Sequence, residues 1–263
     1  MKSEQKERAS DRDVESVRKL IQERKADPYV QERTAKNVFG PSPQFEKERF
    51  WWVLLGCLLT SQQRSTTGYP VDRFLSLRDF PLTLARCKGQ EQTIIEVLTD
   101  FGGIRMAPTI ACRAHANHLW LENGGWARME RWFQRLAEQR SLAPKREHSR
   151  RERDAARLAA INLEGIGPKQ SRNLWQWLGL TRYEIPLDSR VVGWINRNLS
   201  TQVDESKLWD DKYYELILDY VQDVCAKAGV LPCIFDAAAF DNENVLNGER
   251  LSGNSCCDTR NYE

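Results

Sequence analysis

Hydrophobic residues recur along this chain at the three- and four-residue spacing that is typical of helices. A first helix is expected to begin after Ser10, a good N-cap, and to stop at Asp27-Pro28. The longest apolar run, residues 45–60, contains no proline and a single glycine, Gly56, and therefore predicts a buried helix. The breaker Gly40-Pro41-Ser42-Pro43 separates these two elements.

The same periodicity continues to the end of the chain. It predicts helices at residues 71–77, 92–98, 107–121, 126–136, 191–199, 208–228 and 234–240. Paired glycines at 102–103 and 124–125 interrupt the pattern, and no convincing alternation of period two indicates a strand. The sequence therefore predicts an all-α fold.

Two further helices are predicted, one ending near Asn162 and one beginning at Pro168, and a glycine-rich turn joins them at Leu163-Glu164-Gly165-Ile166-Gly167-Pro168-Lys169. Gly165 and Gly167 flank one apolar residue, so the backbone can turn tightly with positive φ while Ile166 points inward and peptide N–H groups point outward. Pro168 fits the first turn of the second helix. The unit is a helix, a hairpin and a helix, and its turn can bind an anion such as a phosphate.

Two polar residues near this turn are candidates for catalysis. Lys169 lies in a first helical turn, where the helix dipole and any burial disfavour the ammonium form and favour a neutral, nucleophilic amine. Asp188 precedes the helical run 191–195 and is a natural N-cap. Taken singly, Lys169 is explained as well by a solvated or phosphate-binding lysine, and Asp188 by a cap alone.

Leu163 to Ser171, together with Pro186-Leu187-Asp188-Ser189-Arg190-Val191, resembles the helix-hairpin-helix and Gly/Pro-Asp signature of the DNA base-excision glycosylase superfamily. The resemblance spans roughly residues 40 to 240. In the bifunctional branch, it implies that Lys169 attacks the sugar C1′ and that Asp188 supports the chemistry. The expected activity is that of a DNA glycosylase and abasic-site lyase acting on duplex DNA.

The resemblance also implies a division into two helical domains. A six-helix barrel would span residues 43–181 and carry the hairpin at about 163–169, and residues 10–42 and 182–240 would form the second domain. The active site would lie in the cleft between the two. Residues 1–9 and 242–263 are polar and expected to be poorly ordered.

Family members often place an amide side chain after a helix such as 45–60, where it fills the gap left by an extruded base. Gln62 is the position matched to this role, Gln63 is a rival, and Arg64 follows them. With Gly165 and Gly167 these residues form the predicted DNA-binding set. The alternative is that the first three are ordinary polar residues at a helix end.

The identity of the base is predicted from resemblance alone. A lysine-bearing site without cluster cysteines resembles the branch that removes oxidised purines such as 8-oxoguanine. Asn173, Phe235 and Phe240 are candidates for the base pocket, although each is also explained as a core or helix-surface residue. A glycosylase for oxidised pyrimidines or other modified bases, and a non-catalytic helix-hairpin-helix DNA-binding protein, stay open as alternatives.

Composition adds little to the case for DNA binding. The 263 residues suffice for one large or two packed domains, and the formal charge is only +2, so a basic surface must come from local clustering. Residues 145–153 hold five basic residues against two acidic ones and are expected either to contact phosphates or to form a solvated helix start.

The seven cysteines are irregularly spaced, the first residues are polar, and no apolar run approaches the length of a membrane span. We therefore expect an intracellular, reduced protein that acts as a monomer. Cys225 and Cys233 are followed only by the distant pair Cys256-Cys257, which does not fit an iron-sulfur cluster or a zinc site. No metal site or cofactor is expected, although in relatives the hairpin carbonyls can bind a monovalent cation.

Overall fold

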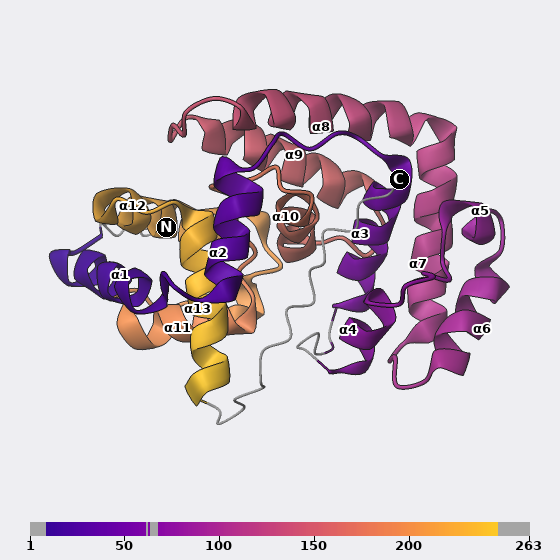
Figure 1. Ribbon diagram of the computed structural model, residues 1–263, viewed down its shortest axis with the longest axis horizontal. Helices are drawn as coiled ribbons and strands as arrows, with labels where there is room; N and C mark the ends of the chain where they lie inside the picture. The colour runs from indigo at the N-terminus through magenta and orange to yellow at the C-terminus, as the bar shows by residue number, and fades with distance from the viewer. Residues whose placement is uncertain (1–8, 62, 64–67, 247–263) are drawn as a thin grey trace, which may run out of the picture.

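The computed structural model describes residues 9–61, 63 and 68–246 of the chain (Figure 1). Every regular element in this part of the chain is a helix, so the predicted all-α fold is confirmed. Within the same ranges, no helix is both long and apolar enough to cross a membrane.

One group of helices packs around the apolar helix α3, and its members α3 to α7 lie on the side of the molecule away from α1 and α12 (Figure 1). In chain order the group comprises α3 (Lys47–Leu59), α4 (Pro70–Leu75), α5 (Leu84–Cys87), α6 (Glu91–Phe101), α7 (Ala107–Trp120), the turn η2 (Leu121–Gly125), α8 (Trp126–Arg140), α9 (His148–Asn162) and α10 (Pro168–Trp177).

Helix α3 is buried on all sides because nearly every residue from Phe50 to Leu59 is apolar. A Cβ at Gly56 would meet the Trp177 ring at 2.8 Å, so the glycine permits α10 to approach α3 closely. The indole Nε1 of Trp51 donates to the Leu82 carbonyl at 3.0 Å and ties the loop before α5 to this core.

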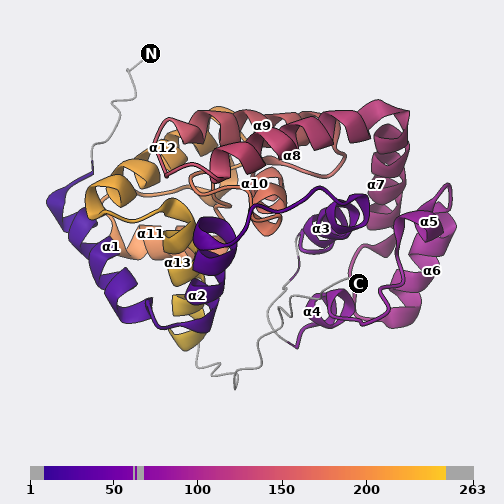
Figure 2. The ribbon, with the colours of Figure 1, turned by 45° about the horizontal axis from the view of Figure 1, so that its top comes forward.

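The second group joins the two ends of the described chain. It comprises α1 (Asp11–Arg24), α2 (Pro28–Thr34), α11 (Ser189–Asn198), the short η3 (Glu205–Lys207), α12 (Asp211–Ala228) and α13 (Pro232–Leu246). Its apolar side chains form a separate cluster, in which α1 packs on α12 and α13, and α2 and α11 pack on α13. Figure 2 shows the two groups side by side, with α8 and α9 bridging toward α12.

Two chain segments cross between the groups next to each other. The first is the wide helical turn η1 (Ala35–Phe39) with the residues that follow it, and the second is the segment from α10 to α11. The buried guanidinium of Arg182 donates to the carbonyls of Asn37 at 3.1 Å, Val38 at 3.1 Å and Leu142 at 3.0 Å, so it joins both crossings to the end of α8. We propose that these crossings separate the two domains predicted at residues 43–181 and at 10–42 with 182–240.

The sequence-based expectations missed two short helices. Asp27 ends the first helix region as expected, but its carboxylate also accepts from the Tyr29 N–H and caps α2. Helix α5 has only four residues, too few for a periodic pattern to appear.

Candidate active site and nucleic-acid interface

The turn between α9 and α10, residues 163–167, is called the hairpin from here on. Gly165 has φ +78°, as the glycine pattern predicts, and Ile166 is buried. Gly167 differs from the prediction, because its backbone is extended and serves as the N-cap of α10 without any side-chain cap. The first N–H groups of α10 therefore have no partner from within the helix or from a capping side chain, which suits an anion.

Asn117 on α7 anchors the hairpin and was not found from the sequence. Its Nδ2 donates to the Glu164 carbonyl at 3.0 Å, and its Oδ1 accepts from the Glu164 N–H at 2.7 Å. Only 1% of the residue is exposed. The only signal for this role is a polar residue on the buried face of a helix, which by itself indicates a hydrogen-bond partner but not which one.

Arg113, one turn earlier on α7, lies directly over the hairpin. A Cβ placed on Gly165 would meet Arg113 Cδ at 2.5 Å and Nε at 3.0 Å. The guanidinium has no ion pair with an acidic side chain in the described ranges. An open pocket of about 410 Å³ adjoins it, lined by Ser61, Arg113, Ala160, Ile161, Leu163, Glu164, Gly165, Ile166 and Gly167. Glu164 is the one acid in this lining and works against anion binding, whereas Arg113 and the α10 N-terminus favour it.

Lys169 is the second residue of α10 and is half-buried. Burial raises the pKa of the Cys57 thiol on α3, and the positive charge of Lys169 opposes that rise. Lys169 is therefore within electrostatic range of Cys57, near the end of α3 that precedes the predicted DNA-binding residues 62–64.

Asp188 caps α11, as predicted. Its Oδ1 accepts from the N–H groups of Arg190 at 3.0 Å and Val191 at 2.9 Å, and the Arg190 guanidinium lies 3.2 Å from Oδ2. The side chain is 11% exposed, so its position is fixed by the helix start but still open to solvent. Lys169 and Asp188 thus stand at the first turns of two consecutive helices, α10 and α11.

Phe240 and Phe235, two of the base-pocket candidates, have different surroundings. Phe240 is half-buried, its ring is tilted against Tyr29 at 5.0 Å, and the Arg190 guanidinium stacks 3.5 Å from its centroid. Phe235 is 0% exposed and packs edge-on against Trp194 at 5.2 Å. Phe235 is therefore a core residue with no open face, and this corrects the expectation for it, whereas Phe240 lies next to the Asp188–Arg190 pair.

Asn173, the third candidate, lies one turn beyond Lys169 and is 9% exposed. Its Nδ2 donates to Gln170 Oε1 at 3.2 Å, and Gln170 Nε2 in turn donates to Thr60 Oγ1 at 3.4 Å. These two hydrogen bonds connect α10 to Thr60 at the end of α3, and Gln170 directly follows Lys169 in the chain.

Gln63 has both ends of its amide engaged within the protein. Nε2 donates to the Leu59 carbonyl at 2.6 Å, and Oε1 accepts from the Arg105 N–H at 3.0 Å. This side chain links the end of α3 to the loop before α7. Gln62 and Arg64, the other two residues predicted for this role, lie outside the described residues.

The basic stretch 145–153 is partly used inside the protein. Arg153 pairs with Glu184 at 2.9 Å and with Asp219 at 2.8 Å, and Arg146 lies 3.3 Å from Asp223. The acids belong to the segment before α11 and to α12. These two arginines therefore join helix groups, which the local charge pattern alone did not indicate.

An acid on α13 is buried close to Asp188. Asp236 pairs with Arg33 of α2 at 3.5 Å, and burial raises the pKa of Asp236 to about 7, with a further contribution from the charge of Asp188. Cys225 and Cys233 are buried free thiols. No group of three or more His, Cys, Asp or Glu residues is placed to hold a metal in the described ranges, and Cys256-Cys257 lie outside them.

Comparisons with known proteins identify a structural relative. No family model and no curated protein matches the chain. The crystal structure of Methanocaldococcus jannaschii 8-oxoguanine DNA glycosylase is similar to the chain with a TM-score of 0.54 and 15% sequence identity. The match covers 88% of this chain and 94% of that one. This similarity confirms the predicted resemblance at the level of the fold.

Proposed function

We propose that the protein is a DNA glycosylase with abasic-site lyase activity and that Lys169 is its nucleophile. The observation that carries the proposal is the half-buried Lys169 in the uncapped first turn of α10, just beyond a hairpin that offers an anion pocket. The fold similarity to an 8-oxoguanine DNA glycosylase supports the same class of reaction.

In this mechanism the damaged nucleotide is extruded from duplex DNA, and the neutral Lys169 amine attacks C1′ as the C1′–N bond to the base breaks. The base departs with the bonding electrons and takes up a proton. Asp188 assists removal of a proton from the lysine and stabilises positive charge on the sugar. Opening of the sugar ring gives a Schiff base, and loss of a C2′ proton then breaks the C3′–O bond.

DNA is held through its backbone in this proposal. The N–H groups at the hairpin and the first turn of α10 bind one phosphate, and Arg113 contacts the same group as a second, side-chain donor. Such contacts fix the register of the duplex without reading its sequence. Duplex DNA containing a damaged base is therefore the proposed partner.

An oxidised purine, with 8-oxoguanine as the first choice, is the proposed base. The fold similarity to the Methanocaldococcus jannaschii 8-oxoguanine DNA glycosylase supports this choice. Duplexes that each carry one lesion, an oxidised purine, an oxidised pyrimidine or uracil, test it. Nicking of the 8-oxoguanine duplex without alkali supports the proposal, and preferential nicking of another duplex overturns the choice of base.

The catalytic proposal itself is tested without knowing the base. A duplex with an abasic site is incubated with the protein and borohydride, which reduces a Schiff base to a stable covalent adduct. The wild type and Lys212→Ala, which alters an exposed lysine of α12, are expected to form the adduct, and Lys169→Ala is not. Absence of an adduct in the wild type, with DNA binding retained, would leave a non-catalytic DNA-binding protein.

A further inference from the structure

One buried guanidinium contacts the backbone next to the proposed nucleophile. Arg172, on the turn of α10 that follows Lys169, is 1% exposed, and its Nη1 donates to the Pro168 carbonyl at 2.9 Å. Pro168 directly precedes Lys169. The peptide that carries the nucleophile is thus held from the interior of the protein as well as by the helix.

Tyr214 packs against the face of the same guanidinium and hydrogen-bonds to the backbone just before Asp188. Arg172 Cζ lies 4.4 Å from the centroid of the Tyr214 ring on α12. The Tyr214 hydroxyl accepts from the Leu187 N–H at 2.6 Å and donates to the Ile185 carbonyl at 3.3 Å. Leu187 directly precedes Asp188. Tyr214 is 0% exposed, so water does not compete for these bonds.

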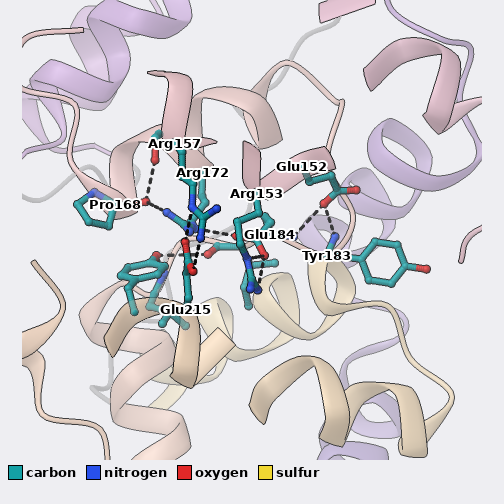
Figure 3. A network of polar contacts seen from close by, with 12 residues as sticks. Glu152, Arg153, Arg157, Pro168, Arg172, Tyr183, Glu184 and Glu215 are labelled. Atoms are coloured by element: carbon teal, nitrogen blue, oxygen red, sulfur yellow. Dashed lines mark hydrogen bonds and ion pairs between the residues drawn. The ribbon is translucent and has the colours of Figure 1, made fainter. Parts of the chain in front are cut away.

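Glu184 fixes the guanidinium between these two contacts (Figure 3). Its Oε2 accepts from Arg172 Nε at 3.0 Å, while Oε1 accepts from Arg153 at 2.9 Å and from Gln222 at 3.0 Å. Glu184 belongs to the segment that connects α10 to α11. In Figure 3, Arg172 lies between Pro168 and Glu184.

Buried ion pairs contribute little stability compared with apolar packing, because both charges must lose their water. Such a network does fix the relative position and orientation of the groups that it joins, since each hydrogen bond has a preferred distance and angle. Here the fixed groups are the Pro168–Lys169 peptide and, on the other side, the Leu187 N–H and the Ile185 carbonyl, which lie just upstream of Asp188. A misplacement of about 1 Å between reacting groups costs on the order of a hundredfold in rate.

We propose that Arg172 and Tyr214 are positioning residues, which hold Lys169 and Asp188 in the mutual placement that the reaction needs. The inference rests on the proposed function. Neither side chain touches DNA, because both are buried. Nη2 of Arg172 has no hydrogen-bond acceptor in the described part of the chain, so Pro168, Glu184 and Tyr214 are what define its position.

The test uses two conservative variants of the full chain. Tyr214→Phe keeps the ring beside Arg172 and removes only the hydroxyl that binds Leu187. Arg172→Lys keeps the charge and loses the planar donors that reach Pro168 and Glu184 together. The single-turnover rate of borohydride-trapped adduct formation on an abasic duplex is expected to fall on the order of tenfold in each. The Kd for a duplex with a tetrahydrofuran abasic analogue is expected to stay within about twofold.

Two control variants alter polar contacts elsewhere, one made by a buried tyrosine and one made by an exposed arginine. Tyr220→Phe, on the same helix, removes a buried hydroxyl that donates to Asp13 at 2.8 Å. Arg157→Lys alters an arginine that joins α9 to Glu215 of α12 at 2.6 Å without contacting Pro168 or Leu187. Both are expected to keep the wild-type rate. The Tm of all four variants is measured by thermal unfolding. The rate assay is then run below the lowest Tm, so that only folded protein is compared.

The inference is overturned if Tyr214→Phe and Arg172→Lys form the adduct at the wild-type rate, or if their DNA affinity falls as much as their rate. It is also overturned if Tyr220→Phe slows the reaction equally, because the effect would then follow from any loss of buried hydroxyl. Failure of the wild type to form an adduct is a different result, and it rejects the proposed function instead.

Discussion

At the scale of single residues, the surroundings of each side chain decide its role more than its type does. Phe240 and Phe235 are both aromatic residues of α13, yet one borders the Asp188–Arg190 pair and the other is sealed in the core. Arg113 and Arg153 are both arginines on helices near the hairpin. Arg153 is neutralised by Glu184 and Asp219, whereas Arg113 lines the hairpin pocket, where the proposed function has it contact DNA.

Arg113→Gln is expected to weaken binding of an abasic-analogue duplex by roughly tenfold at low salt, because one charge-assisted contact to phosphate is lost. The slope of log Kd against log salt is expected to decrease by about one unit. Fluorescence anisotropy over a salt series measures both quantities. Arg131→Gln, on the exposed side of α8, serves as the control, and an equal effect there would show that only overall charge matters.

At the scale of elements, the hairpin depends on a close approach that only glycine allows. Gly165 combines φ +78° with contacts to Arg113 and Leu58 that leave no space for a Cβ. Asn117 then fixes the preceding residue from α7. The hairpin is thus held in place by α7 and α3, and under the proposed function a prearranged site spares the entropy of ordering it when DNA binds.

Gly165→Ala is expected to destabilise the protein by about 1–3 kcal/mol, since it adds a steric clash to the cost of positive φ. Gly89→Ala separates the two effects, because Gly89 has φ +67° but nothing within 4 Å of a Cβ. Urea unfolding of both variants measures the difference. Equal losses of stability would mean that the contacts of Gly165 with Arg113 and Leu58 contribute nothing.

At the scale of the whole molecule, polar groups buried at the crossings join the two helix groups. Glu152 accepts from the N–H groups of Arg182 at 3.0 Å, Tyr183 at 2.7 Å and Glu184 at 2.9 Å. Its single side chain therefore shapes the start of the segment that leads to Asp188. Burial raises the pKa of Glu152 to about 7 despite these three donors.

This raised pKa makes stability depend on pH. The folded protein retains the Glu152 proton at pH values where the unfolded chain has lost it, so the stabilisation is complete below the unfolded pKa and declines as the pH rises through about 7. The decline attributable to Glu152 is expected to be on the order of 3 kcal/mol. Urea unfolding between pH 5 and pH 8 measures it. In Glu152→Gln, which cannot titrate, the decline should be smaller, and an unchanged decline would contradict this assignment.

The sequence was sufficient for the longer helices because each of them has local signals, whereas the short α2 and α5 were missed. Ser10 forms the expected N-cap with Asp13, and the apolar run at residues 45–60 becomes the buried α3 at Lys47–Leu59. The hairpin, Lys169 and Asp188 were also located at helix starts by local glycine, proline and capping signals. Their joint action on one sugar stays a prediction.

Contacts between distant residues could not be predicted in the same way. Tyr214 binds Leu187 and Asn117 binds Glu164 only because the fold brings separate helices together. In the sequence, Tyr214 is one of several residues on the apolar side of a helix, and nothing in its neighbourhood indicates a partner. The basic stretch 145–153 shows the opposite problem, because its local charge does not reveal that acids of α12 lie opposite.

The central claim is that the Lys169 amine forms the covalent bond to the sugar. The most direct measurement is to reduce the complex with an abasic-site duplex by borohydride, digest it, and identify the modified peptide by mass spectrometry. We predict that the DNA remnant is attached to Lys169, and that Asp188→Asn slows formation of this same adduct without moving it to another residue. An adduct on a different lysine, or one formed at the wild-type rate by Lys169→Ala, would contradict the claim.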